Sequence, residues 1–427
     1  MPGIVVLGSQ WGDEGKGRLV DYLAKKSDYV CRFSGGNNAG HTVVYKGKQF
    51  LFTILPSGVL AGKKMVISAG VCFDPEILIS EIESIEKEGI KVKLLIDPRA
   101  HIVMPYHRQR DVANEAKRGK TGVGSVGFGV GYCFVDRARR ENLRFEDIIT
   151  PALAKKKLDY FFPSKRETLE KMYGIESSPK EEILRRVLKF GKKLRPYLCD
   201  VSLELGKALE KGETVSFEGS QGVMLDVNFG TYPYTTGSHI ISGYVFTSVG
   251  LPPQNLKVIG VVKSFSSRAD TGAGPLPTEM STAHGAGKHI LIKGHEFEEF
   301  PGLPVRPRRI GWLDLPMLRY ANQLNKFSEF ALTHADTMMG LKEILVCTHY
   351  EIKKKRYLYP QFPGMTENVK PIYKRFPGWK FEVSKTKRYS DLPRELKSYI
   401  KFIEKETGVP IKYISIGAER KSLIEKR

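Results

Sequence analysis

Short apolar runs alternate along the chain with longer segments in which apolar residues recur every three or four positions. The short runs are rich in Val, Ile and Phe, which is typical of strands buried on both faces. We therefore predict an α/β fold, with a large, mostly parallel central sheet and flanking helices. Strands are expected at residues 4–7, 29–33, 42–45, 49–54, 65–67, 92–96, 214–217, 257–262, 330–332 and 411–416. Helices are expected after the first glycine-rich loop, after Asp74-Pro75, over 105–117 and over 392–407.

Residues 150–210 differ from the rest of the chain, because they are mostly charged amphipathic helix without candidate chemistry. This composition indicates a helical subdomain. No internal repeat, low-complexity tract or linker interrupts the sequence. A single domain over residues 1–427, with 150–210 as a helical insertion, is the simplest organisation.

The first apolar run leads into a turn with Gly8, Gly12, Gly15 and Gly17, which enclose Asp13 and Lys16. Strand, glycine-rich loop, lysine and helix together predict a P-loop-like phosphate site. The loop differs from a Walker A motif, since a glycine replaces the hydroxyl residue after the lysine. A bound Mg²⁺ would need another oxygen, and Asp13 can supply it. An ordinary strand–helix turn is the less favoured alternative.

Further polar loops follow other predicted strands. Asn38 and His41 lie in a second glycine-rich loop at 34–42, and residues 120–132 form a third that we expect to be irregular and mobile. Gln221 follows the strand at 214–217, and an arginine-rich loop spans 302–309. Because the carboxyl ends of parallel strands share one edge of a sheet, these loops predict a single cleft for a nucleotide and an anionic substrate.

The charge balance is strongly basic, with 68 Lys and Arg against 47 Asp and Glu and a net charge of +21. Nucleic acid, anionic small substrates and a lysine-rich surface are the possible reasons. The basic residues are spread along the chain without a zinc knuckle or RNA-binding pattern, so we predict small anionic substrates and no nucleic-acid partner. Five widely separated cysteines, no signal peptide and no apolar run of membrane length predict a reduced, cytoplasmic protein.

Six motifs together resemble one enzyme family. QWGDEGKGR, GNNAGHT, FEGSQGVMLD, GTYPYTT, GAGPLPTE and GWLD are similar to those of adenylosuccinate synthetases, and the similarity runs from residue 3 to about 417. The resemblance implies a GDP-forming carbon–nitrogen ligase of AMP synthesis that condenses IMP with L-aspartate. It further implies GTP as co-substrate, Mg²⁺, a 6-phosphoryl-IMP intermediate and a homodimer.

The same resemblance implies roles for individual residues. Asp13 would be the base that deprotonates IMP, His41 the acid, and Lys16 and Gln221 would assist catalysis. Asp13 and Gly40 would bind Mg²⁺. The implied IMP ligands are Asp13, Asn38, Ser125, Arg139 from the other subunit, Gln221, Thr236 and Arg306. The implied aspartate ligands are Gly302, Leu303, Pro304, Val305, Arg306 and Arg308. The implied GTP ligands are Gly12, Asp13, Glu14, Gly15, Lys16, Gly17, Arg18, Gly40, His41, Thr42, Arg308, His334, Asp336, Ser415 and Gly417.

The chain departs from the family pattern at several ligand loops. Val126 replaces a hydroxyl residue of the IMP-phosphate loop, residues 303–305 lack the usual threonines and glycine, and His334 replaces a lysine. Two alternatives therefore stay open at this point. One is a paralogous GTP-driven ligase with a different nucleotide or amine donor, and the other is a nucleotide-binding protein without catalysis.

Overall fold

The computed structural model describes residues 2–119, 122–269, 274–298, 306–417 and 419–426. Its largest sheet has nine strands in the order β22-β21-β17-β10-β1-β9-β2-β5-β7. Every neighbouring pair is parallel except β21 and β22. The strands are β1 (Gly3–Gly8), β2 (Tyr29–Arg32), β5 (Lys64–Ile67), β7 (Lys93–Ile96), β9 (Val215–Gly222), β10 (Lys257–Lys263), β17 (Glu329–Thr333), β21 (Ile411–Ser415) and β22 (Leu423–Glu425). The predicted fold class is confirmed.

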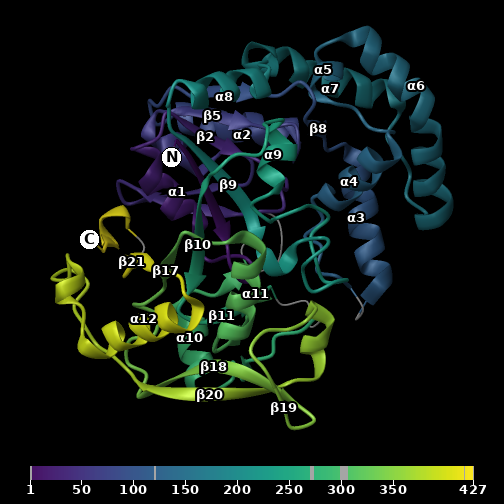
Figure 1. Ribbon diagram of the computed structural model, residues 1–427. Coiled ribbons are helices and arrows are strands. Elements are labelled where there is room, and N and C mark those ends of the chain that lie inside the picture. Colours follow the sequence, from purple (N-terminus) through teal and green to yellow (C-terminus); the bar gives the residue numbers. More distant parts are fainter. Residues whose placement is uncertain (1, 120–121, 270–273, 299–305, 418, 427) are drawn as a thin grey trace.

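The strands that carry the polar loops lie side by side at the centre of this sheet (Figure 1). β1 is hydrogen-bonded to β9 on one side and to β10 on the other. All eight residues of β9 are buried, as is typical of a strand covered on both faces. The phosphate loop after β1 and the polar loops after β2, β9, β10 and β17 therefore open at one edge.

Two of the predicted strands lie outside the central sheet. Residues 42–45 and 49–54 form the hairpin of β3 (His41–Tyr45) and β4 (Lys48–Phe52), whose antiparallel register pairs His41 with Phe52. The hairpin packs near α1 (Lys16–Ala24), on the apolar side of that helix. Its first residue is the predicted acid His41, so the hairpin helps to hold that side chain.

Three further helices lie in the first third of the chain. α2 (Pro75–Glu86) begins as predicted, because Asp74 caps it by accepting the Glu76 N–H at 2.9 Å. α3 (Pro105–Arg118) is followed by the glycine-rich segment and then by α4 (Val130–Arg139). The expectation that 120–132 lacks regular structure is therefore wrong for its last three residues. Gly129, at φ 74°, supplies the left-handed turn from which α4 starts.

The helical region predicted at 150–210 lies at one end of the molecule (Figure 1). It contains α6 (Pro151–Glu167), α7 (Lys180–Leu194) and α8 (Val201–Glu210), next to the short α5 (Phe145–Ile148). Its status as an insertion within a single domain stays a prediction.

A second sheet at the opposite end was not predicted (Figure 1). It contains β16 (Leu313–Asp314), β18 (Glu343–Ile352), β19 (Lys355–Tyr357) and β20 (Lys370–Pro377). In β20 only Phe376 is buried, so no apolar run marks that strand in the sequence.

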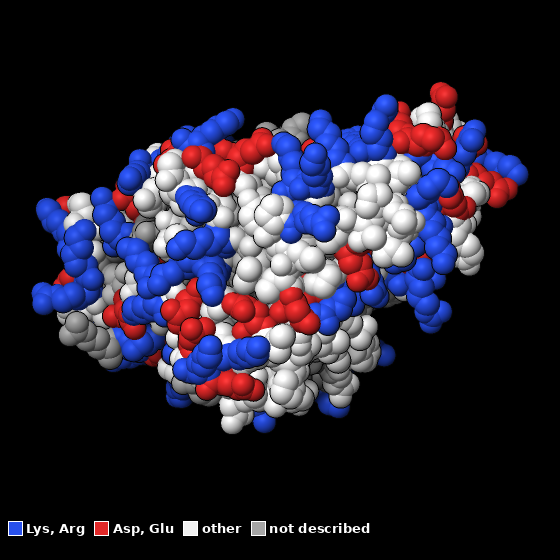
Figure 2. Space-filling model, turned by 90° about the horizontal axis from the view of Figure 1, so that it is seen from above, with Lys and Arg blue, Asp and Glu red and all other residues white. Residues whose placement is uncertain are grey.

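Lysine and arginine side chains are spread over the molecular face shown in Figure 2 and alternate there with aspartate and glutamate. This distribution matches the spread of basic residues along the sequence. Among the described residues, no helix is both long and apolar enough to cross a membrane. All five cysteines are free thiols, and a cytoplasmic location stays a prediction.

Candidate active site

The phosphate loop is stabilised by Glu14, a glutamate of the loop itself. Glu14 is fully buried and accepts the backbone N–H groups of Gln10 and Gly12 at 3.0 and 2.9 Å. Lys16 Nζ lies 2.8 Å from Oε2 of Glu14 and is buried as well. A β-carbon at Gly8 or Gly222 would overlap the Glu14 carboxylate, which explains glycine at both positions. The Glu14 side chain therefore organises the loop from inside and does not face a ligand.

Asp13 is the loop residue whose side chain faces the cavity. Its backbone has φ 58°, the left-handed region, and this conformation directs the carboxylate away from Glu14. Arg308 Nε lies 3.0 Å from Asp13 Oδ2, and the Asp13 side chain is 38% exposed. Burial raises the pKa of Asp13, but Arg308, Lys263 and Lys16 together outweigh burial and lower it. Asp13 is thus a carboxylate at neutral pH.

His41 is held in a buried network at the start of β3. Its Nδ1 lies 2.5 Å from Oε1 of Glu218, and its Nε2 lies 2.9 Å from the carbonyl oxygen of Ser220. Ser57 Oγ also donates to Glu218, and Arg32 lies 3.2 Å from Nδ1. Burial and Arg32 lower the pKa of His41, while Glu218 opposes them. Glu218, at the middle of β9, fixes the orientation of the ring.

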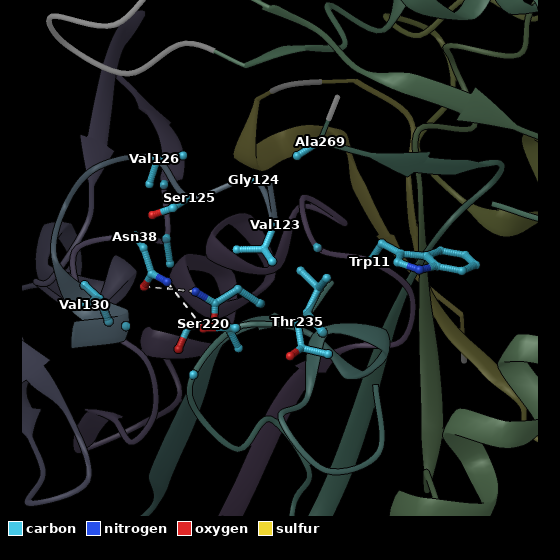
Figure 3. A pocket seen from close by; sticks show the side chains of 18 of the residues that line it. Trp11, Asn38, Val123, Gly124, Ser125, Val126, Val130, Ser220, Thr235 and Ala269 are labelled. Carbon is cyan, nitrogen blue, oxygen red and sulfur yellow. Dashed lines mark hydrogen bonds between the residues drawn. The ribbon is translucent and has the colours of Figure 1, made fainter. Parts of the chain in front are cut away.

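A cavity of about 830 Å³ opens beside Asp13. Asn38, Gln221 and Thr236 line it and contact one another, since Gln221 Nε2 donates to Asn38 Oδ1 at 3.2 Å and Asn38 Nδ2 to Thr236 Oγ1 at 3.4 Å. Figure 3 shows Asn38 with Ser125, Val126 and Val130 on one side and Trp11 on the other. Asn38 after β2, Gln221 in β9 and Thr236 in a later loop thus present amides and a hydroxyl to one space.

Acidic residues of α3 hold the glycine-rich loop at the rim of this cavity. Glu115 accepts the N–H groups of Gly124 and Ser125 at 2.7 and 3.3 Å. Asp111 accepts the Ser125 hydroxyl at 2.6 Å and the Gly129 N–H at 2.9 Å. These N–H and hydroxyl donors are the groups that would bind a phosphate. In this structure they donate to the carboxylates of Asp111 and Glu115 instead. The helix itself was predicted over 105–117, but its part in lining the cavity was not, although Asp111, Asn114, Glu115 and Arg118 lie on one polar face of it.

A second group of predicted residues lies at the ends of β17 and β21, which are parallel neighbours. Arg18 donates to Ser415 Oγ and to the carbonyl of Glu419, and it thereby connects the phosphate helix α1 to this edge. Burial raises the pKa of Asp336, whereas Arg18 and Lys293 lower it in part. His334 is partly exposed and packs edge-on against Phe265, and desolvation together with the nearby Lys263 lowers its pKa to about 4. His334 is therefore neutral at pH 7.

Some predicted ligands are not beside the cavity. The side chains of Lys16 and His41 are buried behind its wall, and Arg139 lies outside it, paired with Glu141 at 2.9 Å and 57% exposed. Gly302, Leu303, Pro304 and Val305 lie outside the described residues, as does the side chain of Arg306. Arg268 also lines the cavity and was not predicted as a ligand.

The sequence matches the family model described as adenylosuccinate synthetase over residues 5–424. The chain belongs to the adenylosuccinate synthetase family. It is 40% identical to adenylosuccinate synthetase from Nitratidesulfovibrio vulgaris, with 100% of both chains covered. It is 41% identical to that of Borrelia turicatae, with 98% of this chain and 97% of the relative covered.

Solved structures agree with this assignment. The fully ligated adenylosuccinate synthetase of Plasmodium falciparum matches with a TM-score of 0.91 and 35% identity over 100% of both chains. Succinoaminodeoxyadenylate synthetase of cyanophage S-2L shares the fold, with a TM-score of 0.62 and 18% identity over 99% of this chain and 95% of that chain. The enzyme is accordingly a GTP-dependent ligase of IMP and L-aspartate in AMP biosynthesis. These similarities do not favour a paralogue with another acceptor or donor.

Proposed function

We propose that Asp13 is the catalytic base of this ligation. The observation that carries the proposal is the position of its carboxylate, which is ionised and faces the cavity beside Asn38 and Gln221. The 6-oxygen of a purine is a poor nucleophile until N1 loses its proton, and a carboxylate within hydrogen-bond reach can accept that proton. The oxygen then attacks the γ-phosphate of GTP, and the amine of aspartate later displaces phosphate from the 6-phosphoryl intermediate.

The polar residues around the cavity are suited to hold IMP. Asn38, Gln221 and Thr236 offer both donors and acceptors to the base and ribose. Ser125 and the amides of Gly124 and Gly129 form the part of the wall that suits a 5′-phosphate. We assign Gln221 an additional role in orienting the 6-oxygen, because its amide lies next to Asn38 on the side of Asp13.

Mg²⁺ fits the donor set at the mouth of this cavity. Asp13 and Gly40 both line it, and they offer a carboxylate and a carbonyl, the hard oxygen ligands that Mg²⁺ prefers. No cluster of three or more protein ligands occurs within the described ranges, as expected for an ion that takes most of its ligands from phosphates and water. When bound, the ion would neutralise charge on the GTP phosphates.

Lys16 and His41 are proposed to stabilise the charge that develops during phosphoryl transfer. Both lie behind the wall formed by the phosphate loop and the loop before β3. Lys16 would exchange its contact with Glu14 for a phosphate oxygen. His41 would hold its Nε2 proton toward the transferring group after leaving the Ser220 carbonyl, while Glu218 keeps the ring oriented through Nδ1.

The guanine end of GTP is proposed to bind at the tips of β17 and β21. The Asp336 carboxylate is the group there that can accept two N–H groups of a guanine. Ser415 and Gly417 lie on the neighbouring strand end, and His334 precedes Asp336. Arg306 and Arg308 are proposed to bind the carboxylates of L-aspartate, with Arg308 also reaching GTP.

A homodimer is proposed because the Arg139 side chain does not line the cavity beside Asp13 in its own chain. Its guanidinium is bound by Glu141, which Lys165 of α6 also contacts at 2.8 Å. Val135, one helical turn before Arg139 on α4, is 43% exposed, so an apolar side chain lies next to the arginine. This surface suits a second copy of the chain that receives Arg139 into its IMP site.

The test of Asp13 is the Asp13→Asn variant, assayed with GTP, Mg²⁺, IMP and L-aspartate by absorbance and by GDP formation. Turnover should fall by a factor of at least about 10³, while the Kd of GTP stays within about tenfold, because amides and Lys16 supply most phosphate contacts. Gln49→Ala, at a residue that lines the same cavity and is not among the implied ligands, is the matched control and should keep most activity. Near-normal turnover of the Asp13 variant would remove this residue from the mechanism.

A further inference from the structure

The turn that carries Asp336, residues 334–340, is held by a tryptophan that follows the second sheet. Trp379 comes two residues after β20 and is 2% exposed. Its indole N–H donates to the carbonyl oxygen of Ala335 at 2.8 Å. Its own carbonyl oxygen accepts the N–H of Gly340 at 3.3 Å. One residue therefore holds the turn both before and after Asp336, and the function proposed above gives it no role.

This contact continues the pairing of β18 with β20 beyond the ends of the two strands. Pro377 pairs with Glu343 at the end of the ladder, and the N–H of Gly378 then donates to the carbonyl of Lys342 at 3.0 Å. A β-carbon at Gly378 would overlap the carbonyl oxygen of Leu341, so the close approach of the two main chains requires glycine. The second sheet is thus in direct main-chain contact with the end of the turn.

Aromatic packing fixes the orientation of the Trp379 ring. The ring centroid lies 5.2 Å from that of Tyr399 on α12 (Arg394–Thr407), with an angle of 59° between the planes. The Tyr399 hydroxyl donates to the carbonyl of Ser264 at 2.7 Å, and Ser264 Oγ donates to the carbonyl of Thr333 at 2.8 Å. Thr333 ends β17 directly before the turn, so the ring and the turn are attached to the same strand end.

The carbonyl that accepts the indole N–H belongs to the peptide group that leads into Asp336. Ala335 is fully buried, and its own N–H donates to the carbonyl of Ser415 at 3.3 Å. The two bonds together fix φ and ψ of Ala335, and hence the direction in which the chain enters Asp336. Without the indole N–H, a buried carbonyl would lose this donor, and the peptide group would turn toward another donor or water.

We propose that Trp379 is a positioning residue for guanine recognition, because it fixes the peptide group that orients the Asp336 carboxylate. This role rests on the proposed binding of guanine by Asp336. A carboxylate accepts the N1–H and the 2-amino group of guanine together only if both of its oxygens lie near the plane of the base. A rotated peptide before Asp336 would break this match and would leave the contacts to the phosphates unchanged. Trp379 thereby sets the preference for GTP over a nucleotide without the 2-amino group.

The decisive variant is Trp379→Phe, which keeps an aromatic ring but removes the N–H donor. Its kcat and KM are measured with GTP and with ITP, which differs from GTP only in lacking the 2-amino group. The KM of GTP should rise about tenfold and that of ITP about twofold, because ITP offers Asp336 only one N–H. The GTP-to-ITP ratio of kcat/KM should therefore fall about fivefold, while kcat with GTP stays within about twofold of the wild type.

Tyr350→Phe is the matched control. Tyr350 lies on β18 of the same sheet, is fully buried, and donates its hydroxyl to Asp314 Oδ2 at 2.7 Å. The substitution likewise removes one buried hydrogen bond of an aromatic side chain, but at Asp314 instead of Ala335. It should lower the thermal stability of the enzyme and leave the GTP-to-ITP ratio at the wild-type value.

A second protein protects the test against poor folding of Trp379→Phe. 3-Benzothienylalanine, incorporated at position 379, keeps the shape of the tryptophan side chain but has sulfur in place of the N–H. Its GTP-to-ITP ratio should also fall about fivefold. A ratio that stays at the wild-type value in this protein, with only thermal stability reduced, would show that Trp379 is merely structural and would overturn the proposal.

Asp336→Ala separates this role from the guanine assignment on which it rests. It should lower the GTP-to-ITP ratio at least as much as Trp379→Phe does. If Asp336→Ala keeps the wild-type ratio, guanine does not bind at this carboxylate and the role of Trp379 fails with it. If Asp336→Ala loses the preference for GTP while the benzothienylalanine protein keeps it, the guanine assignment stands and only the role of Trp379 is refuted.

Discussion

Lys16 Nζ lies 2.8 Å from Oε2 of Glu14, and neither side chain is more than 2% exposed. In most phosphate loops the lysine side chain is available to bind a phosphate. Here Glu14, two residues earlier in the chain, already neutralises its charge. The same carboxylate holds two N–H groups of the loop. The ion pair therefore stabilises the loop in the shape that it needs before GTP arrives.

Glu14→Gln should destabilise the nucleotide-free enzyme by about 3 kcal/mol, because it leaves a buried lysine without its anion. Urea unfolding followed by circular dichroism measures this change. The control is Glu167→Gln, which breaks an exposed pair with Lys171 and should leave the unfolding free energy almost unchanged. Equal effects of the two substitutions would contradict a special role of Glu14.

Asp111 and Glu115 bind the donors that a 5′-phosphate would use. Changing both to the amides, as Asp111→Asn with Glu115→Gln, keeps acceptors beside the loop but removes two negative charges. The Kd of IMP should fall about threefold to tenfold, since less repulsion opposes the phosphate. Calorimetric titration measures it, and inosine, which lacks the phosphate, is the control ligand. Weaker binding of IMP would mean that the carboxylates only support the loop.

Arg139 is expected to act in the neighbouring subunit. Arg139→Leu and Asp13→Ala should each be inactive alone. After mixing and subunit exchange, half of the dimers are hybrids with one complete site, so activity should reach about a quarter of the wild-type value. Turnover of the mixture measures this. Activity that stays at the level of the separate variants, in a mixture shown to exchange subunits, would argue against a shared site.

The buried carboxyl group of Asp314 should make the unfolding free energy of the protein depend on pH. It caps α11 (Leu315–Asn325) and accepts the Tyr350 hydroxyl at 2.7 Å, yet burial outweighs these contacts and raises its pKa to about 7. The ordinary value is 3.8, so the folded state binds the proton more tightly than the unfolded state between these two values. Stability from this group is therefore greatest below about pH 4 and is lost as pH rises toward 7.

Asp314→Asn keeps the cap but cannot ionise. The unfolding free energy of the wild type relative to this variant should fall by about 3 kcal/mol between pH 4.5 and pH 8. Urea unfolding at the two pH values tests this. Parallel pH profiles of the two proteins would show that Asp314 is not protonated in the folded state at acidic pH.

Local chemistry made several features predictable. The apolar run before Gly8 and the glycines after it specify a strand and a tight loop, and Asp74-Pro75 specifies the start of α2. In contrast, β20 could not be predicted, because it is mostly exposed and its pairing with β18 is formed over long sequence separation.

The sequence by itself determined the family, the strand–loop–helix of the phosphate site and the residue types available for catalysis. Only the tertiary structure decided which of these face a ligand. Asp13 and Glu14 are adjacent carboxylates, yet one points into the cavity and the other under its own loop. That difference depends on a left-handed φ at Asp13 and on the space left by Gly8 and Gly222. Likewise, Arg308 comes to lie 3.0 Å from Asp13 although the two residues are far apart in the sequence, and no local pattern encodes that contact.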